Sequence, residues 1–244
     1  VARIQPSFEH PIYTFNNIGA YQVGLSVTSS RGCTETGEKI ITIFDLPTVD
    51  FTAEPFVCLG DEISFTDLSE INGASIVKWV WNLGDGTIDN NQHPIHTYNF
   101  AHVFDISLIV TSSEGCKNDT LVPAMIEVFN LPVADFEAST LFASELTSEI
   151  EFYNTSEGAS EYLWDFDNGE TSTDNNPIID FVYVGNYEVL LGVKNDNGCY
   201  SEVVRTVHIH PEYTIFVPNA FSPNGDGDND MFQAKGNGIT EFEM

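Results

Sequence analysis

An acidic loop near the C-terminal end holds the residues best suited to binding a metal ion. Asn224, Asp226, Asp228 and Asp230 place side-chain oxygens at alternate positions, as calcium-binding loops do. If Asn224 is the third position of an EF-hand loop, however, Gln233 occupies the twelfth, where a bidentate Glu belongs. The loop therefore fails the EF-hand pattern. Weak calcium binding and an ion-free Asx turn both remain open for this segment.

The six histidines are the candidates for catalysis. His10 and His93 stand at the same position of a repeated segment, where Asn176 stands in a third copy, and no Ser or Cys nucleophile recurs beside them. We therefore expect a turn role there. His208 and His210 alternate onto one face of a strand end, but no third metal ligand lies nearby in the sequence. Phosphate loops, G-x-S-x-G and H-E-x-x-H are absent from the sequence, so we expect no enzyme.

Charge and hydropathy narrow the class of protein. The 244 residues include 37 Asp and Glu against 8 Lys and Arg, a net charge of -29 that repels polyanions and excludes nucleic acid as a partner. A hydrophobic content of 42% is enough for packed cores. No run of 18 apolar residues is present, so we expect no membrane span. Because the sequence starts at Val1 without a signal peptide, we interpret it as an internal piece of a longer precursor.

Stepping along the chain, one pattern occurs three times at a spacing of 83 residues. Each copy has a Pro-Ile pair, then an alternating strand of the form aromatic-x-Val/Ile-x-Leu-x-Val, then a Gly-Cys pair. The cysteines of these pairs are Cys33, Cys116 and Cys199. The period of two predicts a strand that buries one face, and the glycine before each cysteine predicts a turn with positive φ. A further β-rich run follows each turn, so every copy should contain a hairpin.

The front half of the repeat is visible only twice, around Trp81 and Trp164, which are again 83 residues apart. Roughly seven short strands in a repeat of about 80 residues indicate a β-sandwich. We therefore expect residues 1–46 to be the C-terminal half of one domain and residues 47–130 and 131–211 to be two whole domains. The predicted class is all-β.

The cysteines lack C-x-x-C spacing and a histidine set, which argues against zinc and favours disulfides. Cys58 precedes the predicted strand at Ile63, and Cys116 follows a hairpin turn, so we expect both at one end of the middle sandwich. A Cys58–Cys116 disulfide is the resulting prediction. Cys199 would then be a free thiol, because no cysteine stands at the counterpart of Cys58 in the third copy.

The repeated motifs W-x-x-G-D-G, H-P-x-H-T-Y, Y-x-V-x-L-x-V and G-C resemble the PKD (polycystic kidney disease) domain over residues 1 to about 210. The resemblance implies tandem immunoglobulin-like β-sandwiches of the kind found in surface proteins and as spacers in secreted hydrolases. Asp85 matches the motif aspartate, whereas the third copy has Asn168 there. The aspartate is therefore expected to form a turn and not to catalyse.

Residues 212–244 resemble the opening of the gliding-motility-associated C-terminal domain, the type B sorting domain of type IX secretion in Bacteroidota. The resemblance implies the start of a further β-sandwich, whose later strands are missing from the sequence. The matching motif residues are Pro218, Asn219, Phe221, Pro223, Asn224, Gly225, Asp226, Gly227, Asp230 and Phe232.

Together, the two resemblances imply the C-terminal end of a secreted, SprB-like giant gliding adhesin on the cell surface. The implied partners are the type IX machinery, including an outer-membrane protein of the PorP/SprF type, and an extracellular protein or carbohydrate bound by upstream domains. The alternative is a PKD spacer and sorting signal of a secreted hydrolase whose catalytic domain lies upstream. Further repeats upstream would favour the adhesin, and a catalytic domain would favour the hydrolase.

Overall fold

The computed structural model describes residues 12–216 and 235–237, and this part of the chain is all-β, without a helix. It contains a β-hairpin, two larger β-sandwich repeats and a short strand pair. In the strand pair, β20 (Thr214–Phe216) runs antiparallel to β21 (Lys235–Asn237). The expected fold class is confirmed for the described residues.

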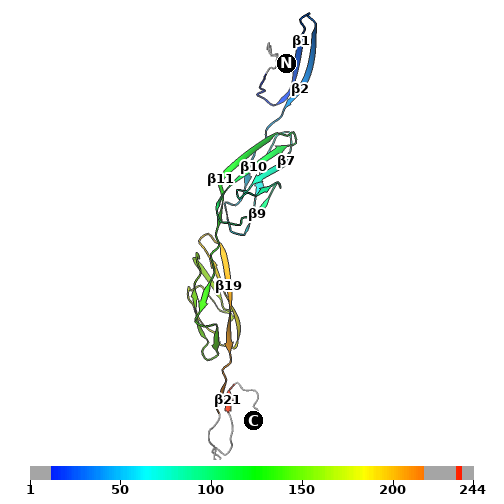
Figure 1. The fold of residues 1–244 in the computed structure, drawn as a ribbon. Coiled ribbons are helices and arrows are strands. Elements are labelled where there is room, and N and C mark those ends of the chain that lie inside the picture. Colours follow the sequence, from blue (N-terminus) through cyan, green and yellow to red (C-terminus); the bar gives the residue numbers. More distant parts are fainter. Residues whose placement is uncertain (1–11, 217–234, 238–244) are drawn as a thin grey trace, which may run out of the picture. The chain divides into compact units, whose positions relative to one another are not determined.

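The hairpin consists of β1 (Gly19–Thr28) and β2 (Thr34–Ile43), which pair antiparallel without a break in register (Figure 1). Its turn contains Gly32 at a φ of 85°, as predicted from the Gly-Cys pair. Leu25 in this hairpin is 65% exposed, whereas its counterparts in the two larger repeats, Leu108 and Leu191, are completely buried. The apolar face of this strand is therefore buried in the two larger repeats. In the hairpin, no described residues cover it.

The second repeat places five strands in one sheet and two strand pairs opposite them. The order in the sheet is β4 (Phe56–Cys58), β11 (Lys117–Phe129), β10 (Val103–Ser112), β7 (Ile76–Asn82) and β8 (Ile88–Asp89). Only β4 and β11 run parallel in this sheet. The opposing pairs are β3 (Phe51–Thr52) with β6 (Thr66–Asp67), and β5 (Glu62–Ser64) with β9 (Ile95–Thr97).

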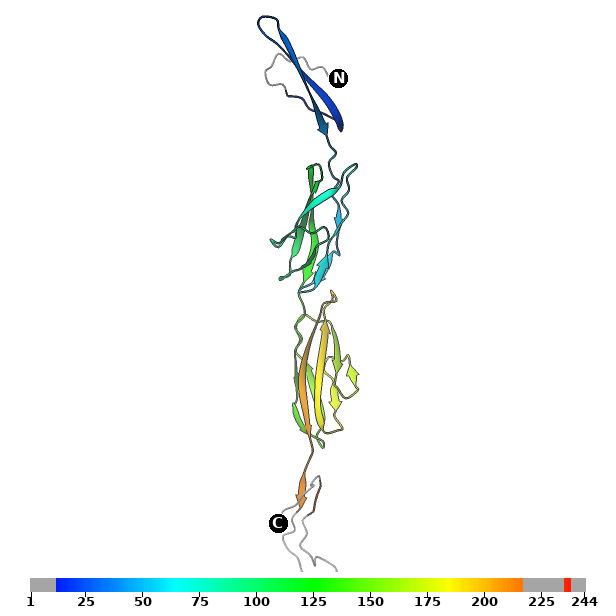
Figure 2. The same cartoon turned by 90° about the vertical axis from the view of Figure 1, so that its right-hand side faces the viewer.

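The third repeat has the same strand order in its larger sheet, whereas its opposing strands form one continuous sheet (Figure 2). Its larger sheet has the order β13 (Phe142–Ser144), β19 (Tyr200–His210), β18 (Gly185–Lys194), β15 (Glu161–Asp165) and β16 (Thr171–Ser172). The smaller sheet has the order β12 (Phe136–Ala138), β14 (Glu149–Asn154) and β17 (Ile178–Asp180). The parallel pair at the edge, β13 with β19, corresponds to β4 with β11.

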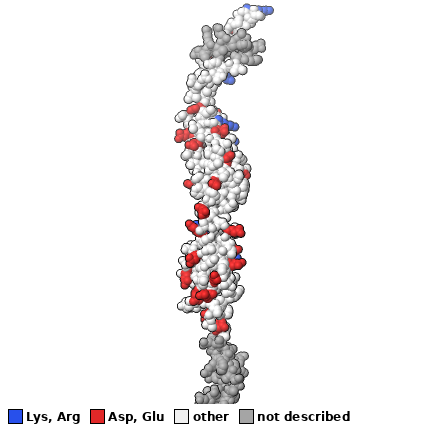
Figure 3. Space-filling view, turned by 90° about the vertical axis from the view of Figure 1, so that its left-hand side faces the viewer, with Lys and Arg blue, Asp and Glu red and all other residues white. Residues whose placement is uncertain are grey.

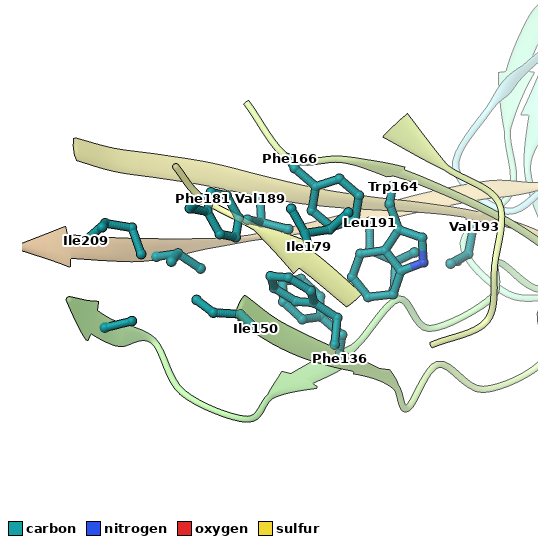
Figure 4. Close-up of a cluster of buried hydrophobic side chains, with 13 residues drawn as sticks. Phe136, Ile150, Trp164, Phe166, Ile179, Phe181, Val189, Leu191, Val193 and Ile209 are labelled. Atoms are coloured by element: carbon teal, nitrogen blue, oxygen red, sulfur yellow. The ribbon is translucent and has the colours of Figure 1, made fainter. Parts of the chain in front are cut away.

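A fully buried tryptophan stands at the centre of each core. Trp164 lies edge-on to Phe136, with 5.1 Å between ring centroids, in the cluster drawn in Figure 4. Trp81 lies edge-on to Phe51 in the second repeat at 5.0 Å. Each indole N–H donates 2.9 Å to a backbone carbonyl ten residues later, so the polar atom of each ring is satisfied. The tryptophan of each repeat therefore has the same position and the same polar partner in its core.

The two repeats also differ in how the two long strands of the larger sheet pair. Phe104 and Ile106 on β10 have partners on β11 that are four residues apart, so β11 carries two extra residues in a bulge. Ala124 in the bulge has a φ of 49°, and its N–H donates 2.7 Å to a carboxylate oxygen of Asp105. In the third repeat β18 and β19 pair without interruption.

Candidate functional site

The turn after each core tryptophan is built by a side-chain oxygen that accepts a backbone hydrogen bond two residues further on. Asp85 Oδ1 accepts from the N–H of Thr87 at 2.9 Å, and Asn168 Oδ1 accepts from the N–H of Glu170, also at 2.9 Å. Aspartate and asparagine therefore form the same Asx turn. The expected role of the motif aspartate as a turn former is confirmed.

Asp85 also makes a contact that the sequence analysis missed. Its second carboxylate oxygen lies 2.8 Å from Nε2 of His96, and both side chains are largely buried. Burial by itself would raise the pKa of Asp85, but the hydrogen bonds from Thr87 and His96 outweigh burial and hold that pKa below its ordinary value. The third repeat replaces both partners, with Asn168 and Ile179 at the corresponding positions. That joint replacement was the signal that could have revealed the pair.

A carboxylate hydrogen-bonded to an imidazole, as in the Asp85–His96 pair, is also part of a catalytic triad. The residues around the pair therefore decide whether it could act in catalysis. The ring of His96 packs edge-on against Tyr98, with centroids 4.6 Å apart, and Tyr98 stacks on Phe104 at 4.3 Å. The buried hydroxyl of Tyr98 donates 2.9 Å to the carbonyl of Leu83, and burial raises the pKa of that tyrosine. Among the described residues the imidazole of His96 has a hydrogen bond to Asp85 and none to a serine or cysteine, so no nucleophile completes a catalytic triad. The arrangement therefore ties the turn to strand β9.

A second polar network surrounds Asp67 on strand β6. The carboxylate accepts three hydrogen bonds, from the indole N–H of Trp79 at 2.7 Å, the amide of Gln92 at 3.1 Å and the backbone N–H of Ser69 at 3.0 Å. The backbone N–H of Asp67 donates 3.2 Å to Nδ1 of His93. His93 thus holds the loop before β9 to strand β6, by a bond between distant segments and not by the local turn role expected for it.

The third repeat makes the corresponding network with asparagines. Asn176, the counterpart of His93, accepts from the backbone N–H of Asn154 at 3.0 Å. The side chain of Asn154 donates 2.8 Å to Asn175 and accepts 2.9 Å from the backbone N–H of Ser156. Since Asn Oδ1 and His Nδ1 can occupy the same place as acceptors, neither position needs an imidazole.

His208 and His210 lie on one face of β19, as predicted, and each has a local partner. Nδ1 of His208 lies 2.8 Å from Oδ1 of Asn186, and Nδ1 of His210 lies 3.2 Å from the carbonyl oxygen of Pro211. The ring of His208 also stacks on Phe142 at a centroid distance of 4.8 Å. Within residues 12–216 and 235–237 there is no group of three or more His, Cys, Asp or Glu side chains that could hold a metal ion.

The cysteines differ from the prediction. Cys33 and Cys116 are free thiols, whereas Cys58 and Cys199 are disulfide-bonded. The predicted Cys58–Cys116 disulfide is therefore wrong, and so is the predicted free thiol at Cys199. Cys58 and Cys116 cannot meet because strand β11 runs between their positions.

Cys116 immediately precedes the first residue of β11, and Cys58 pairs with its last residue, Phe129. The first and last of the 13 residues of β11 are twelve steps apart. At about 3.3 Å a step the two ends are roughly 40 Å apart, and the bulge shortens this distance slightly. A disulfide requires Cα atoms within about 7 Å. The two cysteines therefore belong to opposite ends of the second repeat, not to one end.

The proposed calcium ligands and the sorting motif, residues 218–232, lie outside the described residues. The roles given to Asn224, Asp226, Asp228 and Asp230, and to the rest of the motif, stay predictions.

A family model for the PKD domain matches residues 45–126 and 130–210, which together make up more than half of the chain. The chain belongs to the PKD domain family. Among solved structures, the PKD1 domain of Vibrio anguillarum Epp is 24% identical and aligns over 36% of this chain and 100% of its own, with a TM-score of 0.32. The PKD1 domain of the Vibrio cholerae metalloprotease PrtV is 32% identical over 33% of this chain and 98% of its own, with a TM-score of 0.30.

Membership of this family has a general functional meaning. PKD domains are typical of extracellular or secreted proteins, and their role is typically non-catalytic. In the described part of the chain no helix has the length and apolar character needed to cross a membrane.

Proposed function

We propose that this chain is the non-catalytic stalk and export segment of a secreted cell-surface adhesin for gliding motility. In this proposal the PKD repeats hold a distal binding module away from the cell. The segment from residue 212 onward directs type IX secretion, with an outer-membrane protein of the PorP/SprF type as its partner.

The observation that carries the proposal is the position of the sorting motif. The second of the two PKD matches, which covers the third repeat, ends at residue 210. The motif begins at Pro218, so only a short junction separates the last repeat from the sorting segment. If the resemblance to the sorting motif were only a chance match of a turn, the Asn-Gly-Asp-Gly run alone would be expected to match. Phe221, Pro223 and Phe232 match the motif as well, and no turn requires them.

The connections before the two PKD repeats support a stalk role. The side chain of Asn118 donates 2.8 Å to the carbonyl of Pro47, and the side chain of Asn195 donates 3.0 Å to the carbonyl of Asn130. In both cases the hairpin of a repeat holds the segment that leads into that repeat. These connections contain no Gly/Ser-rich spacer.

The charge distribution suits a surface exposed to solvent. On the face shown in Figure 3, Asp and Glu side chains are scattered over both PKD repeats and Lys and Arg are sparse. A high net charge of one sign keeps such a surface soluble and discourages association between copies. The exposed apolar face of the first hairpin supports the interpretation of residues 1–46 as the C-terminal half of a PKD-like domain.

Weak calcium binding by Asn224, Asp226, Asp228 and Asp230 is part of the proposal. A bound Ca²⁺ would offset the repulsion between three carboxylates that lie within five residues. Calorimetry on the complete C-terminal domain should detect heat on calcium addition. If calcium addition produced no heat and chelation did not change the melting temperature, the proposed calcium binding would be contradicted.

The test of the proposed function is the location of the PKD repeats in the native organism. Antibodies against the second repeat should label intact, unpermeabilised cells, and the precursor should carry further repeats upstream. A catalytic domain upstream would support the hydrolase spacer instead. Labelling that appears only after the outer membrane is permeabilised would contradict the proposed location.

A further inference from the structure

A cavity of about 460 Å³ opens on the second repeat, between strand β7 and the loop formed by residues 68–75. Its volume is within the range of about 300 to 1,000 Å³ typical of ligand sites. Two carboxylates, Asp67 and Glu70, line it, together with the indole of Trp79 and the polar side chains of Asn72 and Gln92. No Lys, Arg or His is among the residues that line the cavity. The site is therefore negatively charged and has an aromatic wall.

Asp67 is the unusual member of this site, because its side chain is almost fully buried, with 7% of the residue exposed. Every group that donates to its carboxylate is neutral: the indole of Trp79, the amide of Gln92 and a backbone N–H. These hydrogen bonds satisfy the oxygens but leave the negative charge without a counter-charge. Burying such a charge is costly unless an opposite charge compensates it.

The third repeat shows that the local fold does not need this charge. Asn154 stands in the place of Asp67 and makes the equivalent turn and cross-strand hydrogen bonds. Tyr162 stands in the place of Trp79, and its hydroxyl donates to the carbonyl of Ala159 instead. The carboxylate and the indole of the second repeat are therefore additions to a framework that works with neutral groups.

We propose that this cavity binds the guanidinium group of an arginine side chain presented by a partner protein. A guanidinium carries several N–H donors in a planar fork, which suits two carboxylates and an amide oxygen. Its flat face also packs well on an indole, with a cation–π contribution. A calcium ion fits less well, because it requires six to eight oxygen ligands and the described residues contain no cluster of three or more acidic or other metal-ligating side chains.

The chain supplies its own reporter for the test, because it has three tryptophans, of which Trp79 alone lines the cavity. The three indole N–H signals can be assigned in a ¹⁵N–¹H spectrum by single Trp→Phe variants. The intact protein is then titrated with N-acetylarginine amide, and with N-acetylcitrulline amide as the neutral isostere. The arginine compound should move the Trp79 signal saturably, with the signals of Trp81 and Trp164 nearly unmoved, and citrulline should have no effect.

Asp67→Asn is the decisive variant, because Asn154 shows that asparagine fits this position. It should weaken the response to the arginine compound at least tenfold and leave the spectrum otherwise folded. Glu70→Gln should weaken it less, because Glu70 is not held by a comparable network. Equal responses to citrulline, an unchanged response in Asp67→Asn, or an unmoved Trp79 signal would overturn the proposal. A larger shift of Trp79 with calcium chloride than with the arginine compound would also overturn it, in favour of a metal site.

Discussion

Replacement of Gly84 by alanine should destabilise the second PKD repeat strongly, and Gly86→Ala is its matched control. Both glycines lie in the turn after Trp81 and have similar positive φ angles, +87° and +95°. A Cβ atom on Gly84 would lie 2.8 Å from the carbonyl oxygen of Asp105 and 2.9 Å from Cβ of Phe104. A Cβ atom on Gly86 would meet no heavy atom within 4 Å. The two variants therefore share the backbone strain and differ in the clash.

The expected magnitudes follow from these two contributions. A left-handed conformation costs an L-residue about 1–2 kcal/mol, and this cost applies to both variants. Overpacking against backbone and a core residue adds about 1–3 kcal/mol for Gly84→Ala alone. We therefore expect a loss of about 1–2 kcal/mol for Gly86→Ala and about 2–5 kcal/mol for Gly84→Ala. The second loss is a large part of the stability of a typical domain.

Native-state hydrogen exchange in rising urea, read by mass spectrometry, measures the free energy of unfolding of each repeat separately. Peptides from β10 and β11 report on the second repeat, and peptides from β18 and β19 serve as the reference in the same molecule. Equal losses in the two variants would refute the claim that close packing against Asp105 decides the outcome. The third repeat already has Asp167 in the place of Gly84, at a φ of 56°, with the backbone N–H of Glu188 donating 3.2 Å to its carboxylate.

Three further outcomes are expected. His93→Asn should change the free energy of unfolding of the second repeat by less than about 0.5 kcal/mol, because asparagine replaces the hydrogen-bond acceptor. His93→Ala removes the acceptor and should lower this free energy by about 1 kcal/mol. Equal losses for the two variants in urea titrations would contradict this. The pKa of Asp85 is lowered in the folded state, so its carboxylate stabilises the repeat above its ordinary pKa of 3.8 and this contribution is lost as pH falls through the folded value. Asp85→Asn should therefore flatten the acid side of the stability curve, and an unchanged curve would refute the assignment. Alkylation without reductant should label Cys33 and Cys116, whereas Cys58 and Cys199 should react only after reduction; labelling of all four would contradict the structure.

The core and its strands could be predicted from the sequence because the repeat itself carries the information. Trp81 and Trp164 recur at 83 residues and make the same ring contacts, and the Gly-Cys turns have the positive φ expected of them. The bulge in β11 can also be detected in the sequence. The Phe-Asp/Asn-Leu-Pro junctions that begin at Phe44 and Phe129 are 85 residues apart. The Gly-Cys pairs before them are 83 apart, and β11 carries two extra residues.

The disulfide and the polar pairs could not be predicted in the same way, because they depend on which ends of strands meet. Cys58 and Cys116 both lie beside turns in the sequence, but β11 runs the length of the sandwich between their positions. Asp85 and His96 are eleven residues apart and come together only because β9 returns beside the tryptophan turn. Local patterns give strands and turns, whereas these contacts require the three-dimensional arrangement.

The most direct test of the proposed function is the surface level of a chain that lacks residue 213 and everything after it, expressed in the native organism. The repeats should fold and accumulate in the periplasm, because the segment that the secretion machinery recognises is gone. The matched control deletes residues 131–211 and replaces Cys58 with serine, which removes a whole repeat and leaves the sorting segment intact. Quantitative labelling of intact cells should show the control at the surface and the truncated chain below detection. If the truncated chain reached the surface at the level of the full chain, the export role of the C-terminal segment would be contradicted.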